Sequence, residues 1–240
     1  MSKRDELKAK RRKQILQQRL TVIGIIVVGA ILIASILIIP NLNLTPVGAF
    51  NIPTMVAYPQ VNGNAMGNPN APVKLVIYAD FQCPACSNWS KDYESGFLAK
   101  YVATNKVYFV YIPFSFIDDN GPGTESKDSA AAAFCAMDQG KFWEFHDILY
   151  ANQNGENTGS FTAKRLAAFA QKLGLNMEQF NSCFNSGKYK SQVLQDKAEG
   201  AALGVNSTPS FAVNGKLVVL QSSYNELDTA IDAALAAKTK

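Results

Sequence analysis

The pair Cys83-Pro84-Ala85-Cys86, which directly follows the apolar run Leu75–Ala79, constrains this chain more than any other feature. Two cysteines separated by two residues can switch between dithiol and disulfide. The run predicts a buried strand, and Pro84 is suited to the first position of a helix, which places Cys83 at the helix N-cap. There the free N–H groups of the first turn and the helix dipole stabilise a thiolate, so the pKa of Cys83 is expected to fall from about 8.5 towards roughly 3.5–7. Cys86, one turn further on, is then the resolving thiol.

A C-x-x-C pair can also be half of a zinc site, which needs two further ligands at suitable spacing. The chain offers only Cys135, Cys183 and its single histidine, His146, and none of them belongs to a second C-x-x-C. His146 falls at helical spacing with apolar residues of its own segment, which favours a half-buried core histidine over a ligand or acid–base role. We therefore predict no metal site.

The N-terminal part of the chain combines a basic stretch with an apolar one. Residues 1–20 carry eight lysines and arginines against two acids, and Thr21–Ile39 runs nineteen residues without a charge. As a helix this run is about 28 Å long, enough to cross the apolar core of a bilayer. The basic flank is expected to stay cytoplasmic, which places everything after Pro40 on the other side. Beyond residue 20 acids slightly outnumber bases, so nucleic-acid binding is not expected.

Two fates are open for this apolar segment. It exceeds the roughly 7–15 residues of a signal peptide's core, which favours a retained signal anchor. Cleavage near Val47-Gly48-Ala49 would instead release a secreted domain. Either way the working domain is extracytoplasmic, where disulfides form and persist. Residues 40–66, rich in proline and asparagine, are expected to be a tether.

The rest of the chain has strand signals on either side of a helical block. Strands are predicted over Val73–Ala79, Val107–Pro113, Ser210–Val213 and Lys216–Leu220, the last two joined by the hairpin signal Asn214-Gly215. Helices are predicted over Ser87–Tyr101, Ser126–Gln139, Lys141–Asn152, Thr162–Leu173, Met177–Ser186, Tyr189–Leu203 and Ser223–Ala237. Gly140, Gly174 and Gly187 stand where helices should end.

Three blocks of sequence carry a resemblance to a known family. They are Asn70–Cys86, Gln139–Asp147 and Leu203–Gly215. In these blocks and in their order the chain resembles the thioredoxin-fold DsbA-like oxidoreductases, including membrane-anchored bacterial forms. The resemblance implies an α/β thioredoxin fold over residues 67–240. A helical insertion at about 118–204 would separate its β-α-β and β-β-α halves.

The resemblance also assigns a second segment to the site. In this family the proline of Thr208-Pro209 is cis and faces the C-x-x-C. The cis bond exposes the backbone of Thr208 for pairing with an extended substrate peptide, which holds the substrate's cysteine beside Cys83. Without the resemblance, Thr208-Pro209 would be taken for an ordinary turn.

The chain departs from the family pattern at two positions. Many thioredoxin-fold enzymes carry a buried carboxylate six residues before the first cysteine, thought to shuttle the proton of the resolving cysteine, and this chain has Ile77 there. Asp80 is the nearest acid, and strand alternation predicts a solvent-facing side chain outside the catalytic set. Ala85 stands where the strongest oxidases of the family have a histidine, so a less oxidising potential is expected.

Cys135 and Cys183 lie 48 residues apart in the predicted insertion. Related members of the family sometimes bridge this pair, and an oxidising compartment favours pairing over two free thiols. A bridged loop of this length would add about 4 kcal/mol of stability in the chain-entropy model. The alternative is two buried thiols that act as small apolar side chains.

Together these features predict an extracytoplasmic thiol–disulfide oxidoreductase with no metal or organic cofactor beyond the Cys83–Cys86 pair. As an oxidase it would donate that disulfide to secreted or membrane proteins that contain cysteines. A DsbB-like or VKOR-like membrane partner, implied by the resemblance alone, would reoxidise it. A reductase or isomerase using the same dithiol is one alternative, and a copper-binding module with cysteine ligands is another. Nothing in the sequence requires more than a monomer.

Overall fold

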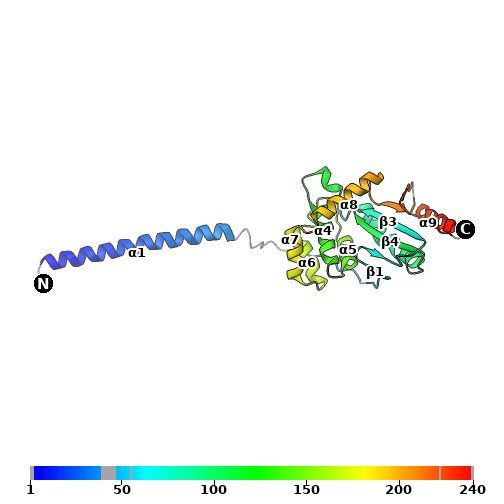
Figure 1. Ribbon diagram of the computed structural model, residues 1–240. Helices are drawn as coiled ribbons and strands as arrows, with labels where there is room; N and C mark the ends of the chain where they lie inside the picture. The colour runs from blue at the N-terminus through cyan, green and yellow to red at the C-terminus, as the bar shows by residue number, and fades with distance from the viewer. Residues whose placement is uncertain (1–2, 39–46, 55, 222, 239–240) are drawn as a thin grey trace. The chain divides into compact units, whose positions relative to one another are not determined.

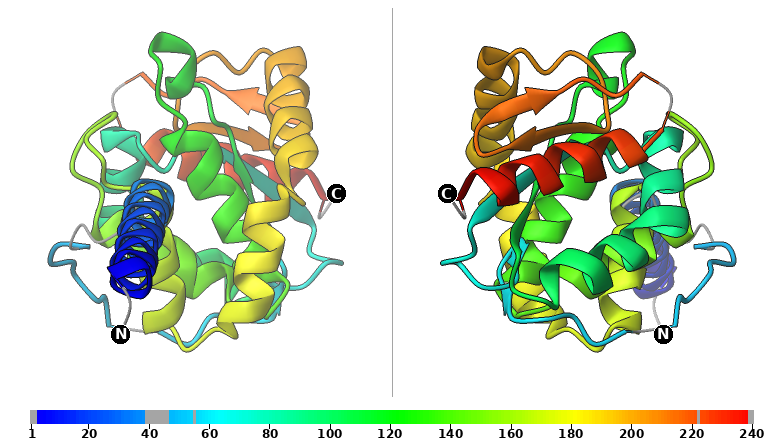
Figure 2. Two further views of the ribbon diagram at one scale, coloured as in Figure 1. Left: turned by 90° about the vertical axis from the view of Figure 1, so that its left-hand side faces the viewer. Right: turned by 90° about the vertical axis from the view of Figure 1, so that its right-hand side faces the viewer.

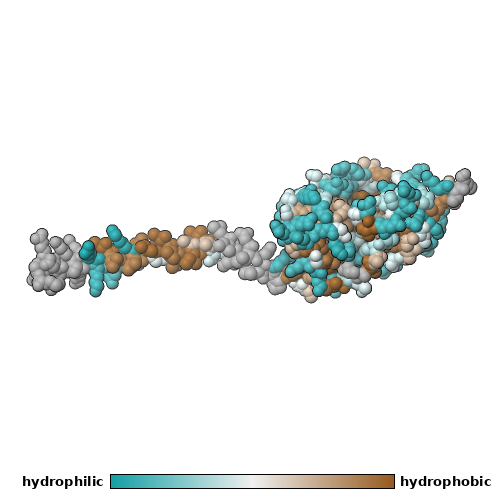
Figure 3. Space-filling view, turned by 60° about the horizontal axis from the view of Figure 1, so that its bottom comes forward, coloured by the Kyte–Doolittle hydropathy of each residue, from teal (hydrophilic) through white to brown (hydrophobic). Residues whose placement is uncertain are grey.

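The computed structural model describes residues 3–38, 47–54, 56–221 and 223–238, which divide into two compact units (Figure 1). The first unit, which ends at Gly48, contains one long helix, α1 (Lys3–Ile38). Its stretch Arg12–Ser35 is long and apolar enough to cross a membrane, and hydrophobic side chains follow one another along it (Figure 3). The helix fits the predicted signal anchor but begins before Thr21, because lysine and arginine are good helix formers. The predicted end at Ile39 and residues 40–46 of the predicted tether lie outside the described residues.

The second unit, Ala49–Lys240, is built on a six-stranded sheet of order β1-β2-β4-β3-β5-β6. The strands are β1 (Val61–Asn62), β2 (Ala65–Met66), β3 (Val73–Ala79), β4 (Val107–Pro113), β5 (Ser210–Val213) and β6 (Lys216–Val218). β3 and β4 run parallel, and every other pair is antiparallel. This is the mixed sheet of a thioredoxin fold, as predicted. β3, β4 and β5 have the predicted bounds, while β6 ends at Val218 rather than at Leu220.

One continuous helical stretch joins β3 to β4, and a block of helices separates β4 from β5. The stretch consists of α2 (Pro84–Asn88), the π-helix η2 (Trp89–Tyr93), α3 (Glu94–Phe97) and the π-helix η3 (Leu98–Val102). The insertion consists of η4 (Ile117–Asn120), α4 (Glu125–Met137), α5 (Phe142–Ala151), α6 (Ala163–Lys172), α7 (Met177–Ser186) and α8 (Lys190–Leu203), and α9 (Asn225–Lys238) follows the hairpin. The glycines predicted at helix ends, Gly140, Gly174 and Gly187, all have positive φ, which glycine adopts at no steric cost.

The two faces of the sheet are covered by different helices (Figure 2). The stretch Pro84–Val102 lies on one face, where Trp89 packs on Phe211 of β5, and α9 lies beside this stretch. α8 lies on the opposite face. It approaches so closely that a Cβ atom on Gly200 would lie 3.0 Å from the ring of Tyr78. The cysteine pair therefore begins a helical stretch that packs on the sheet and is bonded along its side to α9.

The tether prediction is wrong for residues 49–54 and 56–66, which we call the lead segment. β1 and β2 belong to the sheet, and residues upstream of them pack on the insertion. The ring of Phe50 lies 5.0 Å from that of Phe169, and the backbone N–H of Asn51 donates to Oδ1 of Asn152 at 2.7 Å. The polar groups of this segment find partners in the packing: the side chain of Asn51 donates to the carbonyl of Ala151 on α5, and the carbonyl of Ala49 accepts from Arg165 on α6. The folded domain thus begins at Ala49 rather than at residue 67.

Candidate active site

Cys83 lies at the point where the chain leaves β3 and enters the helix. Its backbone is extended, with φ −74° and ψ 122°, Pro84 occupies the first turn, and the carbonyl of Cys83 accepts the N–H of Ser87 at 3.1 Å. The N–H of Cys83 donates to the carbonyl of Asp80 at 3.0 Å and closes the preceding turn. The sulfur is therefore positioned at a helix N-terminus, as the sequence predicts.

The sulfur of Cys83 is surrounded by hydrogen-bond donors. The thiol of Cys86 is the strongest influence, and the side chain of Thr208 and the N–H groups of Cys86 and Ala85 add to it. Together they lower the pKa of Cys83 from 9.0 to about 6, although burial opposes the shift. As a thiol, Cys83 donates from Sγ to the carbonyl oxygen of Thr208 at 3.3 Å. At neutral pH the sulfur is thus mainly a thiolate, the form that attacks disulfides.

Cys86 has the opposite character, since its side chain is 0% exposed. Burial, and next its hydrogen bond with Cys83, raise the pKa of Cys86 well above the ordinary value of a thiol. Ile77, at the position where related enzymes carry a carboxylate, is buried and pairs with Tyr111 across β3 and β4. The side chain at that position cannot accept the proton of Cys86.

Thr208 and Pro209 reach the cysteine pair from a segment 125 residues away in sequence. The peptide bond between them is cis, and Pro209 leads directly into β5. The side chain of Thr208 lowers the pKa of both Cys83 and Cys86. The fold therefore gathers the predicted site residues in one place, with Pro84 and Ala85 exposed on the first helical turn.

Asp80 is buried, which corrects the prediction that it faces solvent. Its side chain is 2% exposed: Oδ1 accepts the N–H of Gln82 at 2.9 Å and the hydroxyl of Ser126 at 2.7 Å, and Oδ2 accepts the N–H of Ile117 at 3.2 Å. Burial raises the pKa of Asp80 to about 7 against these hydrogen bonds. Strand alternation fails here because β3 ends at Ala79, so that Asp80 already lies in the turn, where residues of the insertion cover it.

Gln82 is a second buried polar residue of the site, and the sequence reasoning missed it. Its amide donates to Asp118 Oδ1 at 3.1 Å and to Ser126 Oγ at 2.8 Å, and its Oε1 accepts the N–H of Asn157 at 2.6 Å. Asp118 also accepts the N–H of Ser126 in the first turn of α4. These bonds fasten the turn before Cys83 to the insertion. The available signal was a glutamine directly before the first cysteine, but its partners could not be identified from the sequence.

His146 is 0% exposed, so the prediction of a half-buried histidine is wrong in extent. The apolar periodicity of its helix predicted correctly that the side chain faces the core. Its polar neighbours are Glu94, with Oε2 3.7 Å from Nε2, and Asp147, with Oδ1 3.1 Å from Nδ1. The imidazole therefore lies with two carboxylates, which periodicity along its own helix could not indicate.

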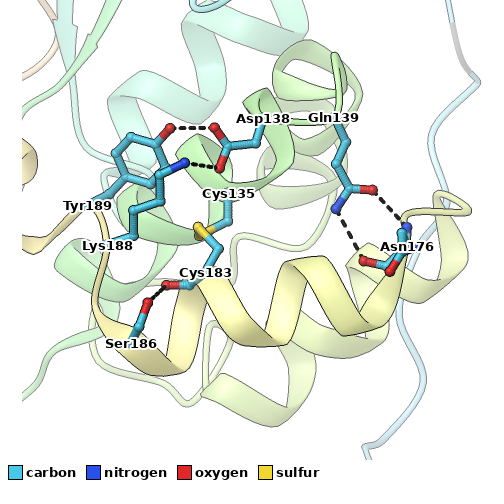
Figure 4. The surroundings of a disulfide bond; sticks show 8 residues. All are labelled: Cys135, Asp138, Gln139, Asn176, Cys183, Ser186, Lys188 and Tyr189. Atoms are coloured by element: carbon cyan, nitrogen blue, oxygen red, sulfur yellow. Dashed lines mark hydrogen bonds and ion pairs between the residues drawn. A yellow bond between two sulfur atoms is a disulfide. The ribbon is translucent and has the colours of Figure 1, made fainter.

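Cys135 and Cys183 form a disulfide between α4 and α7, with Cα atoms 5.8 Å apart (Figure 4). Close to it, Asp138 accepts from Lys188 Nζ at 2.7 Å and from the hydroxyl of Tyr189 at 2.6 Å. The C-terminal end of α4 is thus joined to α7 by a covalent bond and to the segment before α8 by polar contacts. The arrangement fits a structural role within the insertion.

The arrangement at Cys83 has the chemical parts of a thiol–disulfide exchange site. The sulfur of Cys83 is a stabilised thiolate after the end of a strand, and the sulfur of Cys86 is a buried thiol. The backbone of Thr208 lies beside the sulfur of Cys83. The disulfide between them would be opened by a nucleophilic thiolate from outside.

Known proteins are similar to this chain in sequence and in fold. Residues 60–233 match the family model described as Thioredoxin. The chain is 32% identical over 173 residues to the probable disulfide bond formation protein D of Bacillus anthracis, which covers 71% of this chain and 77% of that protein. Its fold is similar to that of oxidised BdbD from Bacillus subtilis, with a TM-score of 0.65 and 23% identity over 75% of this chain and 96% of that one. It is also similar to that of Wolbachia pipientis alpha-DsbA1, with a TM-score of 0.63 and 19% identity over 76% and 95% of the two chains.

Proposed function

Because this chain belongs to the DsbA-like thiol–disulfide oxidoreductases of the thioredoxin fold, we propose that it acts as an oxidase, which donates the Cys83–Cys86 disulfide to proteins outside the cytoplasm. The observation that carries this direction is the pKa of Cys83, lowered to about 6 chiefly by the Cys86 thiol. A sulfur that is stable as a thiolate is a good leaving group, and its disulfide is correspondingly easy to break. The reduced form is then favoured, as an oxidase requires.

The reaction begins with the oxidised pair. A substrate thiolate attacks Sγ of Cys83, the bond between Cys83 and Cys86 breaks, and Cys86 leaves as a thiolate that takes up a proton. The substrate's second thiolate then attacks the substrate sulfur of this mixed disulfide and expels Cys83 as a thiolate. The products are an oxidised substrate and a reduced enzyme, in which the buried Cys86 holds its proton.

Thr208 and Pro209 are assigned to holding the substrate peptide. The carbonyl of Thr208 lies 3.3 Å from the sulfur that the substrate attacks, so a backbone N–H paired with it would bring the substrate cysteine to Cys83. Pro84 and Ala85 are exposed on the first helical turn and would contact the same peptide.

DsbA-like proteins act on substrates that contain cysteines and exchange electrons with a redox partner. For this chain we assign the partner to a quinone-linked membrane oxidant of the DsbB-like or VKOR-like kind. α1 would hold the enzyme at the membrane as a single span, with the basic N-terminus in the cytoplasm and the catalytic domain outside. The enzyme would act as a monomer. It would need no metal or organic cofactor, because thiol–disulfide exchange moves electrons from one sulfur pair to the next.

The reduction potential of the Cys83–Cys86 pair tests the direction. The full chain in detergent micelles is equilibrated with glutathione buffers, and free thiols are trapped and counted by mass. A potential between about −120 and −180 mV supports the oxidase, whereas one near −270 mV would assign a reductase instead. A Cys135→Ala/Cys183→Ala variant serves as the control, because every thiol counted in it belongs to the active-site pair.

A further inference from the structure

A buried acid–imidazole pair lies beside the active-site helix and takes no part in the exchange described above. Glu94 of α3 is 4% exposed, and its Oε2 faces Nε2 of His146 at 3.7 Å. On the other side of the ring, Asp147 Oδ1 lies 3.1 Å from Nδ1 and also accepts the hydroxyl of Tyr58 at 2.6 Å. Among the described residues, Oε1 of Glu94 and Nε2 of His146 have no hydrogen-bond partner.

The fold places this pair in the interior at a cost. The π-helical turn Trp89–Tyr93 comes directly before Glu94 and changes the direction in which the side chains that follow it point. His146 is enclosed by the rings of Phe81, Tyr111, Trp143 and Tyr150, with centroids 4.9 to 6.0 Å away. Charges in such surroundings are strongly disfavoured unless they are paired. A packing role alone would be served better by apolar side chains.

Both members of the pair are set to exchange a proton. Burial raises the pKa of Glu94, and the charge of His146 only partly opposes the shift. Burial alone would lower the pKa of His146, but Glu94 and Asp147 more than offset it and raise the pKa. The other titratable groups near the pair are Asp147 and Tyr150 on α5, Tyr111 on β4 and Tyr58 of the lead segment, and Cys86 and Asp80 in turn act on Tyr111 and Tyr150. A proton can therefore pass to or from the pair without leaving a lone charge in the interior.

A cavity of about 260 Å³ reaches Glu94, the acid of the pair, from the side of several exposed residues. Glu94, Asp147 and Tyr150 line it, together with the exposed residues Lys91 and Ser95. A space of this volume holds several water molecules, each occupying about 30 Å³ in the liquid. The cavity therefore provides a path along which a proton can reach the solvent.

Two tyrosine hydroxyls extend this path towards the cysteines. Tyr150, which lines the cavity, shares a 2.6 Å hydrogen bond with the hydroxyl of Tyr111, and both tyrosines are buried. Burial is the largest cause that raises the pKa of Tyr111, and the charge of Cys86 is the next, with Glu94 also contributing. The hydroxyl of Tyr111 is thus within electrostatic reach of both the resolving thiol and the acid.

We propose that Glu94 and His146 are the acid–base pair that takes the proton of Cys86, acting through the joined hydroxyls of Tyr111 and Tyr150. When Cys86 attacks a mixed disulfide on Cys83, the Cys83–Cys86 bond forms and the partner's sulfur leaves as a thiolate. The proton of Cys86 passes to Glu94 and from there through the cavity to solvent. In the opposite direction the pair returns a proton to Cys86 as it leaves. The inference rests on the proposed exchange at Cys83 and Cys86, but not on the direction of net transfer.

The test isolates the step in which Cys86 must lose its proton. The reduced full chain in detergent micelles is loaded with glutathione on Cys83, and the release of glutathione by Cys86 is followed from weakly acid to alkaline pH. Glu94→Gln keeps the size of the side chain but cannot accept a proton, so release at neutral pH should be at least about tenfold slower. In alkali the variant and the wild type should converge, because hydroxide then removes the proton.

A matched control and a second variant keep the test decisive. Glu144→Gln removes a carboxylate from the same helix as His146, one that is part-exposed and paired with Lys141, and should leave the release rate unchanged. Tyr150→Phe breaks the hydroxyl link without touching the acid and should slow release in the same pH-dependent way. The single histidine gives one imidazole resonance, which verifies that each variant keeps the surroundings of His146 and reports its pKa.

The outcomes separate the inference from the proposed function. A Glu94→Gln profile that overlays the wild type, or that is lower by one constant factor at every pH, would overturn the role of the pair. A wild-type protein that never releases glutathione would overturn the exchange itself, and the inference with it.

Discussion

Two cysteines lie in the active-site turn and two lie on the packed helices α4 and α7, and we assign opposite uses to the two pairs. Cys83 and Cys86 lie two residues apart at the junction of a strand and a helix, and both are free thiols in this structure. Cys135 and Cys183 lie 48 residues apart on two packed helices and are joined. All four side chains are buried, so burial alone does not separate a reactive pair from a structural one.

The difference lies in the groups around each sulfur. The sulfur of Cys83 meets a thiol, a threonine side chain and two backbone N–H groups, which lower its pKa to about 6. Cys135 lies within a helical run of buried alanines and a phenylalanine, whose backbone N–H groups are engaged along the helix. A disulfide is easily exchanged where the protein stabilises a thiolate, and it is inert where the protein offers the sulfur no donors.

The largest effect is expected at Cys83. Cys83→Ser removes the only sulfur that can form the mixed disulfide, so oxidation of a reduced dithiol peptide should fall to the uncatalysed rate. Cys86→Ser should differ in kind, because Cys83 can still react but nothing resolves the product, so the mixed disulfide accumulates and is seen by mass. Thermal unfolding of both variants serves as the control. Turnover by Cys83→Ser would contradict the assignment of the nucleophile.

The second effect is expected at the structural pair, and it concerns stability rather than chemistry. Cys135→Ala/Cys183→Ala opens a loop of 48 residues and should lower the free energy of unfolding by about 4 kcal/mol in the chain-entropy model. The rate of peptide oxidation should stay within about twofold of the wild type, because the pair is not joined to the catalytic thiols. Denaturant unfolding and the peptide assay measure the two quantities on the same sample. Loss of exchange with unchanged stability would reverse the roles assigned to the two pairs.

Much of the active-site half could be predicted because its signals are local. β3 and β4 are largely apolar runs rich in β-branched and aromatic residues, and both strands have the predicted bounds. The helix N-terminus at Cys83 follows from Pro84 and from the strand before it. The placement of Thr208-Pro209 beside Cys83 came from the family resemblance alone, because nothing local to those residues indicates it.

The predictions that failed have a common cause: each concerns a residue whose surroundings depend on partners distant in sequence. Asp80 is buried because Ser126, 46 residues later, covers it, and the lead segment folds because Asn152, 101 residues later, binds Asn51. The π-helical turn before Glu94 was not predicted either, since apolar spacing describes an ideal helix and cannot report an inserted residue. His146 was placed in the core correctly, but its carboxylate partner on α3 was not.

The smallest effect is expected from Ala85→His, which should shift the pKa of Cys83 and the reduction potential of the Cys83–Cys86 pair. Ala85 is exposed on the first helical turn, so an imidazole fits there without repacking the core, and its positive charge stabilises the thiolate of Cys83. The wild-type pKa of about 6 lies below that of an unfolded cysteine, so the thiolate stabilises the reduced protein above about pH 8.5, and this contribution is lost as the pH falls through 6. In Ala85→His the pKa of Cys83 should fall by about one unit or more. The pH at which the reduced protein loses the stability that the thiolate contributes should fall with it.

Alkylation of the reduced protein measures this shift, because its rate follows the thiolate population. The curve of alkylation rate against pH should have its inflection near pH 6 in the wild type and below 6 in Ala85→His. In Ala85→Gln, which adds bulk without charge, the inflection should stay near the wild-type value. Each unit of pKa corresponds to about 1.4 kcal/mol, so the potential of the pair should rise by about 30 mV per unit. If the pKa fell while the potential stayed fixed, the histidine would stabilise the disulfide as much as the thiolate. The donors around Cys83 could not then be what makes this pair exchangeable and the pair of the insertion inert.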